Sequence, residues 1–116
     1  MNRATRSRAS GDQPCTTTSA ARARVVAARG AAEERLSGTP WHTNAEVSGA
    51  WLRGAAARLG RHATAPIDRA LELGRITLRG YDKILKLAWT IADLEGAESP
   101  GAAQVASAVT LRQQHA

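Results

Sequence analysis

The chain has 116 residues, enough for one small domain, and 16 Lys and Arg against 10 Asp and Glu give it a formal net charge of +6. This length excludes a P-loop ATPase domain accompanied by further modules, and the single cysteine, Cys15, excludes an internal disulfide and a cysteine-cluster zinc site. The positive charge suits an acidic partner such as nucleic acid or a nucleotide phosphate without identifying one. No run approaches the roughly 18 apolar residues of a membrane span, and we expect a cytoplasmic protein that does not contact a membrane.

Residues 1–18 are polar, rich in Arg and Ser, and show no periodicity. This composition predicts a disordered basic tail. The first ten residues also resemble an organelle transit peptide, but the disordered tail is the favoured interpretation. A helical domain is expected over residues 19–116.

In the first half of the domain, the sequence predicts helices that begin or end at glycine and proline residues. Ser19 can cap an alanine-rich helix that runs to about residue 36 and ends in Ser-Gly-Thr-Pro. A second helix is predicted from about Gly49 to Leu59, followed by a link over residues 62–65. Pro66 suits the first position of a third helix, and Gly74 suits its left-handed C-terminal cap.

The second half contains the most regular segment, with Thr77 as a good N-cap and Gly96 as a good helix stop. A last helix is predicted over residues 101–114. No strand-like alternation extends beyond a few residues. The sequence therefore predicts an all-α fold, a small bundle of about four or five short helices, with a thin core of Ala, Leu, Val and Ile.

Motifs for catalysis are missing from this sequence. It has no G-x-x-x-x-G-K-[ST] loop, no strand ending in paired acids, and no H-E-x-x-H, G-x-S-x-G or C-x-x-C motif. The three histidines are far apart in sequence and favour surface positions over a metal site. The chain by itself is therefore predicted not to be an enzyme, with no catalytic residues and no metal site.

Four polar residues of the 77–96 helix, Arg79, Lys83, Lys86 and Thr90, are spaced to lie on one face, opposite the apolar stripe. Arg79 falls in the first turn, where free N–H groups and the helix dipole favour anions, and a guanidinium adds bidentate reach to a phosphate. Charge pattern alone favours a second interpretation, in which these are solvated charges and Arg79 pairs with an acidic residue such as Glu72 or Glu46.

A longer run of residues carries a family resemblance. The run ITLRGYDKILKLAWTIADLEG, followed by a helix containing AQVASAVTLR, resembles the C-terminal domain of magnesium-chelatase-like AAA+ ATPases of the YifB/ComM type. The RVVAAR segment and the NAEV link resemble the beginning of the same domain. The matching residues of the run and the final helix are Thr77, Arg79, Lys83, Ile84, Leu85, Lys86, Ala88, Thr90, Ile91, Ala92, Asp93, Leu94, Gly96, Val105, Ala108 and Arg112.

The resemblance implies a lid that packs on a P-loop core and closes over ATP within a hexameric ring. It implies that Arg79 is the sensor-2-type arginine, which contacts nucleotide phosphate, with Lys83 and Lys86 as a supporting basic face. ATP and magnesium are implied only together with a partner core, and DNA remodelling is the implied activity of the ComM branch.

The sequence departs from this family in lacking the nucleotide-binding core and in carrying Trp89 where the family usually has a hydrophilic residue. We therefore expect a regulatory and interaction module, the C-terminal fragment of a longer ATPase. Two alternatives stay open: a small basic helical protein that binds nucleic acid through its arginines, and a non-functional gene remnant that folds poorly.

Overall fold

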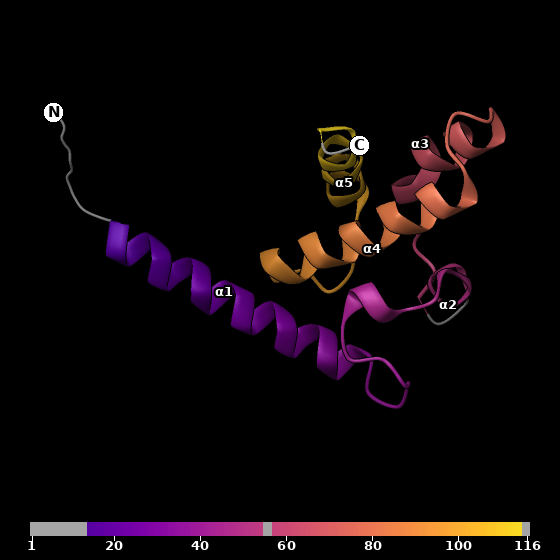
Figure 1. Cartoon of the computed structure of the whole chain (residues 1–116). Helices are drawn as coiled ribbons and strands as arrows, with labels where there is room; N and C mark the ends of the chain where they lie inside the picture. The colour runs from indigo at the N-terminus through magenta and orange to yellow at the C-terminus, as the bar shows by residue number, and fades with distance from the viewer. Residues whose placement is uncertain (1–13, 55–56, 115–116) are drawn as a thin grey trace, which may run out of the picture.

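The computed structural model describes residues 14–54 and 57–114, and every regular element within these ranges is helical (Figure 1). The elements are α1 (Pro14–Arg35), the 3-10 turn η1 (Asn44–Glu46), α2 (Gly49–Arg53), α3 (Arg61–Glu72), α4 (Leu78–Glu95) and α5 (Ala102–Gln114). The all-α prediction is confirmed.

Helix α4 is the centre of the bundle, and each of the other elements packs against it. Figure 1 shows α4 crossing the middle of the molecule, with α5 on one side and α1 and α2 on the other. The Thr77 side chain caps its start by accepting a hydrogen bond from the Gly80 N–H at 3.0 Å. Gly96, with φ at +75°, ends it in the left-handed conformation, as predicted.

Small side chains let the helices approach α4 closely. Ala88, Ala92 and Ala108 are completely buried, and Leu36 and Val105 are almost so. The few large residues fill the remaining space. Trp89 is buried, while Trp41 and Trp51 contact each other edge to face, with ring centroids 5.8 Å apart, and pack against the core. A core with so few aromatic residues is thus built mainly on close backbone approach.

Helix α1 begins at Pro14, a residue type favoured at the first helical position. Residues 14–18 of the predicted tail therefore belong to the helix. The rest of that prediction falls on residues 1–13, which lie outside the described residues.

Two boundaries between residues 49 and 72 differ from the prediction. Helix α2 ends at Arg53 instead of about Leu59, with Gly54 as its C-cap. Helix α3 begins at Arg61, so Pro66 lies inside it and not at its start. The earlier start buries Ala63 one turn before Ile67, and this packing offsets the single backbone hydrogen bond that the proline cannot donate.

Candidate functional site

Arg79 lies in the first turn of α4, and its side chain is exposed. Within residues 14–54 and 57–114 it forms no ion pair. Glu46, one of the acids considered as its partner, instead accepts hydrogen bonds from the backbone N–H groups of His42 and Thr43, at 2.7 and 3.0 Å. These backbone bonds lower the pKa of Glu46. The Arg79 guanidinium therefore lies at the positive end of the α4 dipole, exposed and without a counter-charge from the described part of the chain.

A second guanidinium reaches the same turn of α4. Arg112, near the end of α5, packs against Gly80, where a Cβ atom would lie 2.9 Å from Nη2 of Arg112 and 3.5 Å from Oγ1 of Thr77. The absence of a side chain at Gly80 thus makes room for Arg112. The N-terminal turn of α4 carries positive charge from its own residue and from the last helix.

The other predicted cations of α4 lie in different surroundings. Lys83 is exposed. Lys86 is half-buried, and its Nζ donates to the backbone carbonyl of Ala45 at 3.1 Å. Thr90 is also engaged, since its hydroxyl accepts from the Asn44 side chain at 3.2 Å. The link before α2 therefore contacts the second half of this face, whereas Arg79 and Lys83 are open to solvent.

Behind this face lies a polar network that sequence reasoning missed. The two terminal guanidinium nitrogens of Arg35, at the end of α1, donate to Asp93 of α4, at 2.7 and 3.0 Å. Asn44 joins them, accepting from Arg35 at 2.6 Å and donating to Asp93 at 2.9 Å. The partner of Asp93 is thus Arg35, and not Arg75 or Arg112, although both of these lie closer to Asp93 in the sequence. No local pattern links Arg35 to a carboxylate 58 residues away.

Trp89 forms one wall of the network. The Cζ atom of Arg35 lies 4.2 Å from the centroid of the Trp89 ring, a cation–π contact that covers the face of the guanidinium. The indole Nε1 of Trp89 is buried and, within the described part of the chain, has no hydrogen-bond partner. The indole therefore contributes its apolar face and not its N–H group.

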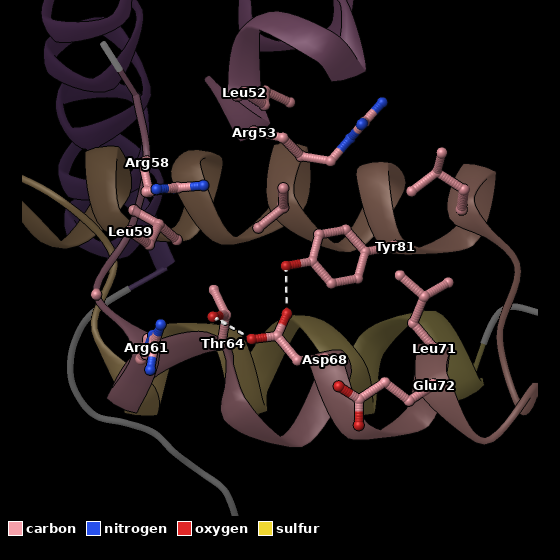
Figure 2. A pocket seen from close by; sticks show the side chains of 13 residues that line it. Leu52, Arg53, Arg58, Leu59, Arg61, Thr64, Asp68, Leu71, Glu72 and Tyr81 are labelled. Atoms are coloured by element: carbon pink, nitrogen blue, oxygen red, sulfur yellow. Dashed lines mark hydrogen bonds between the residues drawn. The ribbon is translucent and has the colours of Figure 1, made fainter. Parts of the chain in front are cut away.

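A groove of about 710 Å³ lies between α3, the end of α2 and the first half of α4. Figure 2 shows the Tyr81 ring in its middle, with the hydroxyl directed at Asp68. That hydroxyl donates to Oδ1 of Asp68 at 2.5 Å, and Thr64 donates to Oδ2 at 2.9 Å. Burial, followed by the hydrogen bond to Asp68 and the charge of that residue, raises the pKa of Tyr81 to about 12.

Positively and negatively charged side chains lie at different ends of this groove. Figure 2 shows Arg58 and Arg61 near one end and Glu72 toward the other. Arg53 is held by Asp82, with Nε 2.9 Å from Oδ1. Both carboxylate oxygens of Asp68 accept hydrogen bonds, one from Tyr81 of α4 and one from Thr64 of α3. The polar centre of this groove is a structural connection between α3 and α4.

Comparison with known proteins decides the family. Residues 15–112 match the family described as "Magnesium chelatase, subunit ChlI C-terminal". The chain belongs to this family. The match covers all of α2 to α4 and extends from the first turn of α1 to Arg112, so it includes both guanidinium groups at the start of α4.

Relatives of this ChlI-type domain are found in mycobacteria. Uncharacterized proteins from Mycobacterium bovis and from two strains of Mycobacterium tuberculosis are each 45% identical to it over 96 residues. The alignment covers 83% of this chain but 19% of each relative, so the chain spans about a fifth of their length. No solved structure matches the chain.

The described part of the ChlI-type domain contains no group of His, Cys, Asp and Glu residues arranged to hold a metal ion. His42 and His62 are exposed, while the His115 side chain and the Cys15 side chain lie outside the described residues. Within the same ranges, no helix has the length and apolarity needed to cross a bilayer.

Proposed function

We propose that the chain is the C-terminal, lid-like module of a YifB/ComM-type AAA+ ATPase, and that Arg79 contacts the phosphates of a nucleotide held by a partner core. The ChlI-type family supports the module. The role of Arg79 is supported by its exposed guanidinium at the start of α4, which forms no ion pair with any residue that the structure describes. Because the chain lacks a nucleotide-binding loop, its proposed role is to interact with a partner core and regulate it. ATP and magnesium would be bound only in the presence of that core.

The chemistry proposed for Arg79 is electrostatic. A fixed cation near the terminal phosphate distinguishes ATP from ADP and stabilises the negative charge that spreads over the phosphoryl oxygens during transfer. The unpaired N–H groups of the α4 N-terminus add to this attraction for an anion. Lys83, one turn later, is a point charge at greater distance from the helix end and has a supporting role at most.

The surroundings of this turn support a rigid placement of the helix start. Thr77 caps α4, and Arg112 packs on Gly80, so the backbone that carries Arg79 is held from two sides. A closing motion of the whole module would then move the guanidinium as a unit with the bundle. In a hexameric ring such motion would couple nucleotide state to remodelling of a DNA substrate, in the cytoplasm.

The test is ATP turnover by the chain combined with a P-loop core subunit of the same family. Arg79→Ala is expected to lower kcat on the order of a hundredfold, because it removes a transition-state contact. Lys83→Ala is the matched control, since it removes an exposed cation from the same helix, and it is expected to change kcat little. Equal small effects of the two substitutions would exclude Arg79 from the phosphate site.

A further inference from the structure

The groove between α3 and the first half of α4 has an open aliphatic wall. Because α3 packs more extensively on α5 than on α4, the space between α3 and α4 is not closed. Leu59 and Leu71 are half-buried in this groove, and Leu78, the first residue of α4, is 45% exposed. A partner that covers these three side chains removes apolar surface from water, which favours binding.

The two ends of the groove carry opposite charges. Figure 2 shows Arg58 and Arg61 at the end near Leu59, and Glu72 beside Leu71 toward the other end. The three charged side chains are exposed, and none forms an ion pair with a residue that the structure describes. Arg61 is also the first residue of α3, where the helix dipole adds to the positive potential. An occupant therefore meets cations at one end of the groove and an anion at the other.

We propose that this groove binds a linear peptide segment of a partner protein, with acidic residues at one end, aliphatic residues in the middle and a basic residue at the other end. The acidic end lies at Arg58 and Arg61, whose guanidinium groups form charge-assisted hydrogen bonds with carboxylates. The aliphatic side chains cover the three leucines, and the basic end lies at Glu72. This binding does not require the phosphate contact proposed for Arg79.

Two other kinds of ligand fit the groove less well than a peptide. A nucleic-acid strand would carry phosphates past Glu72 as well as past the two arginines. Among the described residues that line the groove, the one aromatic side chain is Tyr81, which is 8% exposed and offers no face on which a base could stack. A fatty acid has a single negative head, and its apolar tail would lie beside the Glu72 carboxylate. A peptide supplies both charges and the aliphatic middle.

A random peptide library displayed on phage, selected on the 116-residue chain, tests the proposal. We expect enrichment of peptides in which Asp or Glu residues adjoin a run of aliphatic residues. The most enriched peptide is then synthesised, labelled with a fluorophore and titrated with the chain by fluorescence polarisation.

Reversal of charge at the positive end tests where the peptide binds. Arg58→Glu combined with Arg61→Glu is expected to weaken binding about tenfold or more, because the peptide carboxylates then meet carboxylates. The matched control is Arg22→Glu combined with Arg24→Glu, which changes the net charge equally on the exposed first half of α1. The control is expected to leave the Kd nearly unchanged.

The aliphatic wall is tested separately. Leu78→Ser is expected to weaken peptide binding about threefold or more, because less apolar surface is buried. Its control is Leu73→Ser, since Leu73 is 52% exposed and does not line the groove, and this change is expected to have little effect. Circular dichroism establishes that each variant keeps the helical content and the thermal midpoint of the parent.

Three outcomes would overturn the proposal. The first is a selection that enriches no acidic and aliphatic peptides, and the second is an enriched peptide that the Arg58 and Arg61 double variant binds as tightly as the parent does. The third is an oligo-dT strand or dodecanoate that binds the groove more tightly than the peptide, which would assign the groove to nucleic acid or to an acyl chain. Arg79→Ala is expected to lower ATP turnover with a core and to leave peptide binding unchanged, so the two proposals fail separately.

Discussion

Arg35 and Asp93 join the end of α1 to the last turns of α4 through two parallel hydrogen bonds, of 2.7 and 3.0 Å. The Asp93 side chain is 3% exposed and that of Arg35 is 21% exposed. Asn44 contacts both residues, so the pair also fixes the link between α1 and α2. These hydrogen bonds connect the end of α1 and the link that follows it to a residue of α4 that lies 58 positions after Arg35 in the sequence.

The first prediction concerns the stability that this ion pair provides. Arg35→Ala leaves the buried Asp93 carboxylate without its counter-charge, and we expect a loss of about 3 kcal/mol in the free energy of unfolding. Arg53→Ala is the control, because it breaks the more exposed pair with Asp82 and should cost less than about 1 kcal/mol. Thermal unfolding followed by circular dichroism measures both. Similar losses for the two variants would contradict the structural role given to Arg35.

The second prediction uses Tyr81, the only tyrosine in the chain, whose pKa is about 12 in the fold and near 10 when unfolded. Between these values the unfolded chain loses the phenol proton while the folded chain keeps it. The contribution of Tyr81 to stability is therefore complete below pH 10 and is lost as the pH rises toward 12. Tyrosinate absorbance follows the titration directly in folded and denatured protein.

Tyr81→Phe separates this effect from other alkaline titrations. The variant is expected to be less stable than the parent at neutral pH, because Asp68 loses a hydrogen-bond donor. The stability difference between the two proteins should shrink between pH 10 and pH 12. A difference that stays constant over this range would show that Tyr81 titrates with an ordinary pKa.

The third prediction compares two glycines that have opposite conformations. Gly30 lies within α1 and has open space around its Cβ position, so Gly30→Ala should stabilise the chain by up to about 1 kcal/mol. Gly96 has φ at +75°, so Gly96→Ala should destabilise it by about 1 kcal/mol. Urea unfolding gives both values. Destabilisation by Gly30→Ala would mean that α1 is not helical at this point in solution.

The fourth prediction separates stability from function at Arg79. Its side chain is exposed and, within the described ranges, makes no ion pair, so Arg79→Ala should change the free energy of unfolding by no more than about 0.5 kcal/mol. The thermal midpoint of the isolated chain is the measurement. A large loss of stability would reveal a structural role for Arg79 and would remove the basis for its proposed contact with phosphate.

Much of the fold could be predicted because its signals are local. Thr77 and Gly96 mark the ends of α4 through contacts within one turn. The same segment carries the family resemblance, which the match to the family over residues 15–112 confirms. The start of α3 could not be predicted this way. Local rules place Pro66 at a helix start, whereas burial of Ala63 against the rest of the bundle extends the helix back to Arg61.

The sequence by itself determined the helical class, the bounds of α4 and the presence of Arg79 in its first turn, since these depend on residues a few positions apart. Only the tertiary structure decided which charged side chains contact other described residues and which are exposed to solvent. It pairs Asp93 with Arg35 and engages Lys86 with Ala45, while it leaves Arg79 exposed. The reason is that the path of α1 and the link across α4 sets these contacts, and no periodicity in the chain specifies that path.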